Sequence, residues 1–288
     1  MAGPELYFEK FLGKGSFGSV SLFKYKGRRD SKTLYAAAKT SDDKHAESLY
    51  REYRILSKFK GCPRIVQCYG TKVQETLNVH EGRVEEFTRM LLEGLATIHR
   101  NGYVHCDLKP GNILVFPSCS VNKNGAWSSS HELKISDFGL SRRDGDRSWW
   151  KPRRPFAGTP IYMSPKSISH GETGRGLDLW SLGCVVLEMY TGKKPWWHKN
   201  YDLEDLKNCH EPLIPRDLPC DAKLFIMTCF ALDVEDRKDA STLLRHTFLR
   251  GEVTEPLVNV KTGGGTRKVV PELEKIRQRL SEIRSICV

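Results

Sequence analysis

Two short clusters of polar residues, both within the stretch from His105 to Gly139, constrain this chain more than any other feature. The first cluster places Asp107, Lys109 and Asn112 within six residues, and the second is Asp137-Phe138-Gly139. A carboxylate accepts the proton of an incoming hydroxyl, an ammonium group neutralises a moving phosphate, and amide or carboxylate oxygens bind magnesium. The set predicts a phosphoryl-transfer site, and a chain that builds one must bring two separated segments together.

Each cluster alone has a commoner explanation. An isolated Asp-Phe-Gly is usually a turn in which glycine supplies the positive φ angle. An Asp-Leu-Lys-Pro run such as residues 107–110 is usually a solvated helix end. The ordered combination of both clusters with a glycine-rich loop upstream favours the functional interpretation over these two.

The glycine-rich loop contains Gly13, Gly15 and Gly18 and lies between two strand-like runs. Glycines let backbone amides approach phosphate groups closely. The same glycine spacing opens a helix in dinucleotide-binding folds, whereas residues 20–25 continue here as a strand. We therefore expect a phosphate-covering hairpin rather than a dinucleotide-binding turn.

Together these motifs resemble the signature of eukaryotic protein kinases. The strand-like segment 33–40 carries Ala37-Ala38-Lys39 where that family has V-A-I-K, and the helical segment 46–59 carries Glu52. The resemblance implies that Lys39 grips the α- and β-phosphates of ATP and pairs with Glu52, with Glu47 as the less favoured partner. It also implies a set of further ATP-binding residues, namely Leu12, Gly13, Gly15, Gly18, Val20, Ala37 and Leu114.

The resemblance further implies a role for each residue of the two clusters. Asp107 would orient and deprotonate the substrate hydroxyl, and Lys109 would neutralise the γ-phosphate. Asn112, counted with them as catalytic, would hold Mg²⁺ together with Asp137. Three other residues would complete the site: Thr159 in the activation segment, and Asp178 and Arg237 as structural supports.

The expected fold is α+β and bilobal, with a kinase domain over residues 7–250. A small N-terminal lobe of antiparallel strands plus the family's helix C would span about 7–80, and a large, mainly helical C-terminal lobe about 81–250. Helices are expected from about 83 to 102, from 176 onward, and near 222–229 and 241–249. We expect residues 65–73 to form a strand, and the Ser- and Asn-rich residues 117–131 to form an exposed loop.

The C-terminal residues 251–288 are expected to form a linker followed by an amphipathic helix. Residues 262–266 read Thr-Gly-Gly-Gly-Thr, a flexible composition. Beyond them, apolar residues recur at helical spacing, at Leu273, Ile276, Leu280 and Ile283. We expect this helix to pack back on the C-terminal lobe, and the alternative is that it binds a partner.

One part of the family's pattern is missing ahead of the helix that starts near residue 83. A kinase has there a further strand, the hinge that binds adenine and another helix, which together take about 25 residues. Only the ten residues from Gln74 to Arg83 lie in this interval. We therefore expect the hinge strand and the following helix to be absent, which lowers the expected affinity for ATP. A shortened splice form or gene model would produce this pattern.

Two substitutions also depart from the family. Cys106 replaces the arginine of H-R-D, which normally receives an activation-loop phosphate, so we expect weaker dependence on such phosphorylation. Lys166 replaces the glutamate of A-P-E, which normally pairs with a buried arginine, here Arg237. Losing one partner of a buried ion pair costs about 3–5 kcal/mol, so we expect a less ordered substrate site.

The composition of the chain argues against other classes of function. The formal net charge of +11 would suit a nucleic-acid-binding protein, but the basic residues are spread widely and the densest group, residues 142–154, lies inside the kinase-like region. We therefore expect no nucleic-acid partner. Nine cysteines without a Cys-x-x-Cys pair predict reduced thiols, hence the cytoplasm, the nucleus or both. No apolar run approaches the roughly 18 residues of a membrane span.

The subfamily follows from three further runs. The sequence of residues 107–112 and the Gly158-Thr159-Pro160 block resemble Ser/Thr kinases rather than tyrosine kinases. Residues 156–164, 178–183 and 193–197 look most like plant-type MAP kinase kinase kinases. That resemblance implies Mg-ATP as cofactor and a MAP kinase kinase as protein substrate. The alternative is a pseudokinase, a binding or scaffold protein disabled by the missing hinge. The sequence carries no prediction of the oligomeric state.

Overall fold

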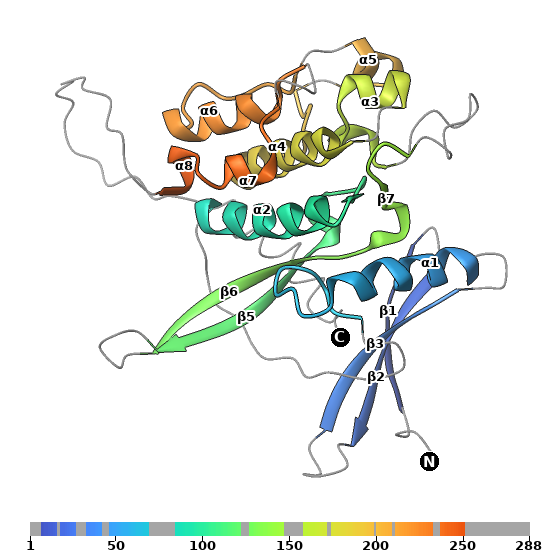
Figure 1. The fold of residues 1–288 in the computed structure, drawn as a ribbon. Helices are drawn as coiled ribbons and strands as arrows, with labels where there is room; N and C mark the ends of the chain where they lie inside the picture. Colours follow the sequence, from blue (N-terminus) through green and yellow to red (C-terminus); the bar gives the residue numbers. More distant parts are fainter. Residues whose placement is uncertain are drawn as a thin grey trace.

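The computed structural model of the 288-residue chain contains a small strand-rich lobe and a larger helical lobe (Figure 1). It describes residues 7–15, 18–26, 33–41, 46–68, 84–121, 127–146, 158–171, 174–198, 200–208, 211–232 and 237–250. The predicted α+β, bilobal fold class is confirmed. The boundaries proposed for the domain and its lobes stay predictions.

The N-terminal lobe is an antiparallel sheet with one helix beside it. Strands β1 (Tyr7–Gly15), β2 (Gly18–Lys26) and β3 (Thr33–Thr40) pair in the order β1-β2-β3. The Gly15↔Gly18 pair closes the first hairpin, and Val20 lies opposite Lys39 on the next strand. Helix α1 (Ala46–Leu56) continues into the 3₁₀ turn η2 (Ser57–Phe59). The sheet therefore presents the glycine-rich hairpin and Lys39 together.

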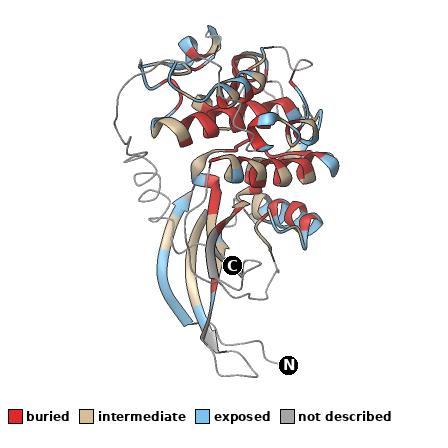
Figure 2. Ribbon diagram, turned by 90° about the vertical axis from the view of Figure 1, so that its left-hand side faces the viewer, coloured by how far each residue is buried: buried red, intermediate tan, exposed pale blue. Residues whose placement is uncertain are grey.

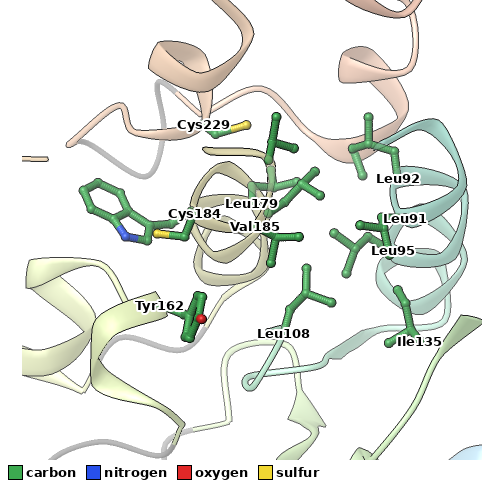
Figure 3. Packing of buried hydrophobic residues seen from close by; sticks show 14 of the residues in the cluster. Leu91, Leu92, Leu95, Leu108, Ile135, Tyr162, Leu179, Cys184, Val185 and Cys229 are labelled. Carbon is green, nitrogen blue, oxygen red and sulfur yellow. The ribbon is translucent and has the colours of Figure 1, made fainter. Parts of the chain in front are cut away.

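The C-terminal lobe is built around α4 (Arg175–Thr191), which is buried on nearly its whole circumference (Figure 2). Helices α2 (Val84–Arg100) and α6 (Cys220–Cys229) both pack against it. Figure 3 shows Leu91 and Leu95 of α2 facing Leu179 and Val185 of α4. Four short helices complete the lobe, namely α3 (Pro165–His170), α5 (Leu203–Asn208), α7 (Ala240–Leu243) and α8 (Thr247–Arg250).

The ends of these helices follow from the sequence. The chain after α2 turns at Gly102 with φ 74°, and α4 ends at Gly192 with φ 66°, a left-handed conformation that glycine adopts without strain. Helix α3 begins after Ser164, whose side chain accepts a hydrogen bond from the Ser167 N–H, and Pro165 occupies its first position. Local sequence thus determines where the chain leaves each helix.

Four strands, two short and two long, flank or connect the two polar clusters. Strand β4 (Tyr103–Val104) pairs with β7 (Arg142–Arg143), so the residues just before the first cluster lie beside those just after the second. Strands β5 (Ile113–Val121) and β6 (Trp127–Ile135) pair antiparallel from Ile113↔Ile135 to Val121↔Trp127. This hairpin brings the chain from the end of the first cluster back to the start of the second.

Three expectations about local structure are wrong in the described residues. The predicted exposed loop 117–131 is wrong at residues 117–121 and 127–131, which are paired strands of the long β5–β6 hairpin, because cross-strand pairing continues past Pro117 despite the polar composition. The predicted strand 65–73 shows only a parallel bridge between Ile65 and Ile135, and residues 66–68 form no strand. The single helix expected at 241–249 is two short helices, α7 and α8, separated by a turn at residues 244–246.

Several expectations concern residues outside the described part of the chain. They are the missing hinge between Gln74 and Arg83, most of the activation segment (147–157), and the C-terminal linker and helix (251–288). Within the described residues, no helix combines the length and the apolar character that a membrane crossing needs.

The contact between α4 and α6 depends on Gly183. A Cβ atom at this position would lie 2.7 Å from the Cβ of Cys229 and 2.8 Å from the Phe230 ring. Protein interiors are close-packed, so neither neighbour has room to withdraw without moving the helix. The absent side chain therefore sets how closely α6 approaches α4.

We predict that Gly183→Ala lowers the free energy of unfolding by about 1–3 kcal/mol, the usual cost of overpacking a core. Chemical denaturation measures this directly. Gly174→Ala is the matched control, because its Cβ would come no closer than 3.8 Å to any neighbour, the Asp144 carboxylate. Equal midpoints for both variants would contradict the tight α4–α6 contact.

Candidate active site

Lys39 on β3 joins the N-terminal lobe to the second polar cluster. Its Nζ lies 2.7 Å from Glu52 Oε2 on α1 and 2.9 Å from Asp137 Oδ1. The other oxygen of Glu52, Oε1, accepts a hydrogen bond from the Phe138 N–H at 3.2 Å. The predicted Lys39–Glu52 ion pair is therefore formed, and it holds helix α1 against the Asp-Phe-Gly segment.

Electrostatics keep Lys39 and Asp137 charged. Burial alone lowers the pKa of the Lys39 ammonium, but the carboxylates of Glu52 and Asp137 more than offset this and raise it above its ordinary value. Burial tends to raise the pKa of Asp137, and the Lys39 ammonium outweighs that effect, so this pKa is lowered. Both groups are thus in the charged form that phosphate and metal binding require.

Asp107 is the centre of a second hydrogen-bonded group. Lys109 Nζ donates to Asp107 Oδ2 at 2.7 Å and to Thr159 Oγ1 at 2.7 Å. The Thr159 hydroxyl in turn donates to Asp107 Oδ1 at 2.8 Å. Asn112 Nδ2 donates to the Asp107 backbone oxygen at 2.8 Å and to Oδ2 at 3.0 Å. Three residues predicted for this region, Lys109, Asn112 and Thr159, therefore meet at the carboxylate of the fourth, Asp107.

Gly158 allows Thr159 to reach this carboxylate. Its φ of 133° lies in a region that side chains disfavour. A Cβ on Gly158 would also lie 2.6 Å from the backbone oxygen of Cys106. The activation segment can therefore approach the first cluster this closely only with glycine here. Sequence analysis gave Gly158 no such role, although its place directly before Thr159 in the Gly-Thr-Pro block was a usable signal.

Asp178 at the start of α4 anchors the backbone ahead of Asp107. Its buried carboxylate accepts hydrogen bonds from the backbone N–H groups of His105 and Cys106, at 2.8 and 2.9 Å. His99 Nε2 lies 2.9 Å from the same carboxylate. The helix N-terminus adds a favourable dipole. The expected anchoring of the catalytic loop is therefore present.

Aromatic stacking connects the two clusters behind the polar groups. The ring of Phe138 packs edge-on against His105 at 4.9 Å and tilted against Phe59 at 5.5 Å. His105 Nε2 donates to the Ser136 backbone oxygen at 2.9 Å, while its Nδ1 accepts from the Asp107 N–H at 3.3 Å. This apolar connection from η2 to the first cluster was not predicted, because its members are far apart in sequence.

The surroundings of Cys106 differ from those of Arg237, the buried arginine that the family pairs with position 166. Cys106 is buried with φ 68°, and burial raises the pKa of its thiol well above the usual range, so it is a neutral, inert group. Arg237 is buried over the Trp180 ring, and its guanidinium donates to three backbone carbonyls, those of Gly176, Ala231 and Leu232. Carbonyl dipoles thus stabilise the Arg237 charge. The disorder predicted from Lys166 stays a prediction.

The residues expected around ATP lie on both sides of Lys39. Leu12 of β1, Val20 of β2 and Ala37 of β3 are half-buried, and Leu114 of β5 is buried. Gly13 pairs with Val20 in the β1–β2 register, and Gly15 pairs with Gly18. The hairpin tip itself, residues 16 and 17, lies outside the described residues. The roles of these residues in binding ATP stay predictions.

The donor set fits a magnesium ion that is bound together with phosphates. In the described part of the chain, no group of three or more His, Cys, Asp or Glu residues could hold a metal alone. Mg²⁺ typically takes only one or two protein ligands, and phosphates and water supply the rest. The Asp137 side chain is 45% exposed and would be accessible to such an ion, and Asn112 would supply an amide oxygen.

Comparison with known proteins identifies the family. The sequence model of the protein kinase domain matches residues 70–249, and a model described as protein tyrosine and serine/threonine kinase matches residues 6–81. The chain belongs to the protein kinase family. It is a protein Ser/Thr kinase, most similar to plant MAP kinase kinase kinases.

Three relatives from Arabidopsis thaliana illustrate this similarity. Mitogen-activated protein kinase kinase kinase 20 is 32% identical over 272 residues, which cover 83% of this chain and 76% of the relative. Mitogen-activated protein kinase kinase kinase 18 is 30% identical over 317 residues, covering 96% and 87%. Mitogen-activated protein kinase kinase kinase 3 is 34% identical over 277 residues, covering 84% of this chain but only 42% of the relative.

The alignment with the second of these relatives is longer than the chain. It extends over 317 residues, whereas the kinase has 288. That relative therefore carries residues that have no counterpart here. In addition, the two family models overlap only at residues 70–81, most of which lie in the interval from Gln74 to Arg83 where the hinge is expected to be absent.

We predict that Asp107→Asn lowers turnover by roughly 10²–10⁴, the usual contribution of acid–base catalysis, because the amide cannot accept the hydroxyl proton. Steady-state phosphorylation assays measure this. Asp144→Asn is the control, since Asp144 is an exposed carboxylate outside the Asp107 group, paired with Arg175. Undiminished turnover in Asp107→Asn would refute the assignment.

We predict that Asp178→Ala lowers the free energy of unfolding by about 3–5 kcal/mol, because it leaves buried donors without an acceptor. Asp144→Ala breaks a more exposed pair with Arg175 and should cost less than about 1 kcal/mol. Denaturant titrations compare the two. Similar losses would show that Asp178 contributes no more than a surface carboxylate.

Proposed function

We propose that this chain is an ATP-dependent kinase that transfers the γ-phosphate to Ser or Thr hydroxyls of a MAP kinase kinase. The observation that carries the proposal is the hydrogen-bonded group of Lys109, Thr159 and Asp107. In this group a proton acceptor, a cation and a hydroxyl of the activation segment are hydrogen-bonded to one another. The Lys39–Glu52 pair supports ATP as the donor.

Each residue of the site has a defined part in the transfer. The substrate oxygen forms a bond to the γ-phosphorus while the bond from that phosphorus to the bridging oxygen of ADP breaks, and Asp107 takes the hydroxyl proton. Lys109 balances the charge on the transferred group, and Lys39 fixes the α- and β-phosphates. Asn112 and Asp137 would hold Mg²⁺, and its positive charge would help to stabilise the charge of the phosphates.

Thr159 supports hydroxyl-bearing protein side chains as the acceptor. It bridges Lys109 and Asp107, so the Asp107 carboxylate already accepts a hydrogen bond from a hydroxyl of the kind that a Ser or Thr substrate carries. A MAP kinase kinase as substrate is suggested by the names of the relatives. Six cysteines in the described part of the chain are free thiols, which supports a reducing compartment such as the cytoplasm or nucleus. We propose no nucleic-acid partner.

We predict that the purified full chain binds Mg-ATP and phosphorylates a generic Ser/Thr substrate, and that Lys39→Met loses this activity because it cannot hold the phosphates. Chelation with EDTA should also abolish transfer. Isothermal titration measures binding and radiolabel transfer measures activity. Glu47→Gln is the control variant, since Glu47 is exposed on the same helix as Glu52.

The outcomes separate the two proposed functions. Transfer that disappears in Lys39→Met supports the kinase and shows that the short interval before residue 84 is tolerated. Binding of Mg-ATP without transfer would contradict the proposal and favour a pseudokinase that binds partners. If the chain neither binds Mg-ATP nor transfers phosphate, the missing hinge has disabled the site.

A further inference from the structure

Helix α6 has an apolar face that points away from the lobe it belongs to. Its inner face is buried against α4 and α8 through a set of residues, namely Ala222, Phe225, Ile226 and Cys229. On the outer face, Cys220 is exposed, and Leu224 and Met227 are each 57% exposed. An apolar face of a helix is normally buried against a neighbouring element. Among the described residues, the outer face of α6 lacks such a cover.

The exposed residues form one stripe. Cys220, Leu224 and Met227 stand at positions i, i+4 and i+7, which lie above one another along a helix. Alternating steps of four and three are the spacing with which two helices interlock side chains along a shared seam. The stripe is therefore suited to a second helix with the same spacing.

This chain contains such a segment. Leu273, Ile276, Leu280 and Ile283 follow one another in steps of three, four and three, with charged residues between them. They lie in residues 271–284, outside the described part of the structure. The chain itself therefore supplies both apolar stripes, and another protein is not needed to form the seam.

The described chain also ends close to helix α6. Helix α8 packs against α6, with the rings of Phe248 and Phe225 at 5.0 Å, and its last residue is Arg250 (Figure 1). Twenty-two residues, Gly263-Gly264-Gly265 among them, separate Arg250 from Leu273. A flexible linker of this length has a root-mean-square reach of about 26 Å. The ten residues of α6 span about 15 Å, so the whole stripe is within reach.

We propose that residues 271–284 form a helix that docks on the outer face of α6 in the same molecule. Its apolar stripe covers Cys220, Leu224 and Met227, and its charged residues face water. The tether makes this contact intramolecular, so it forms at any protein concentration. The inference concerns the outer surface of the C-terminal lobe and does not depend on the proposed activity.

Thiol labelling of Cys220 in the full-length protein tests the contact. We expect Ile276→Asp/Leu280→Asp to increase the labelling rate of Cys220 about tenfold if the docked state is about 90% populated in the unaltered chain. Peptide mass spectrometry separates Cys220 from the other thiols, and half-buried Cys62 and Cys68 report any general loosening. Gln278→Asp/Ser281→Asp is the matched control, because it adds the same two negative charges outside the apolar stripe and should label at the original rate.

Hydrogen–deuterium exchange tests the same contact from the other side. We expect slow-exchanging amides within residues 271–284 of the unaltered chain, and their loss in Leu224→Asp/Met227→Asp. Leu213→Asp is the control, since Leu213 is 47% exposed and lies outside α6. Fast exchange throughout 271–284, with equal Cys220 labelling in all variants, would overturn the proposal. So would protection that appears only as the protein dimerises, because the occupant would then be a second copy.

Discussion

The buried carboxylate of Asp178 is the interaction on which the rest of the site depends. It lies in an apolar core at the start of α4 and accepts hydrogen bonds from the backbone N–H groups of His105 and Cys106. Removing a charge from water is costly unless donors replace the water. The polypeptide therefore satisfies this charge only with the catalytic loop in one conformation, and that conformation places Asp107 beside Lys109 and Asn112.

A second charged group connects this loop to the smaller lobe. Lys39 of β3 pairs with Glu52 of α1 and with Asp137 of the Asp-Phe-Gly segment, and the two carboxylates together offset the burial of its ammonium group. Behind them, Phe138 packs between His105 and Phe59. Polar contacts in front and apolar contacts behind thus hold the phosphate-handling residues of both lobes in one geometry.

The buried surroundings of Cys106 and Arg237 accommodate two of the departures from the family. A buried, neutral thiol at Cys106 adds no charge beside Asp107, so the carboxylate keeps its hydrogen-bonded partners. Arg237 keeps its place under α4 because backbone carbonyls and the Trp180 ring accept its guanidinium. The third departure, the short interval before α2, bears on how adenine is held rather than on the groups that transfer phosphate.

The sequence by itself determined the fold class and the family, because glycine, carboxylate and amide positions with this spacing suit few other chemistries. The roles that it assigns to the residues of the site stay predictions. It also determined the ends of α2 and α4, where glycines stop the helices. Only the tertiary structure decided that residues 117–121 and 127–131 are paired strands of a hairpin, since strand pairing overrides local polarity. The roles of Gly158 and Phe59 were likewise decided there, because each depends on a neighbour remote in sequence, the Cys106 oxygen and the Phe138 ring.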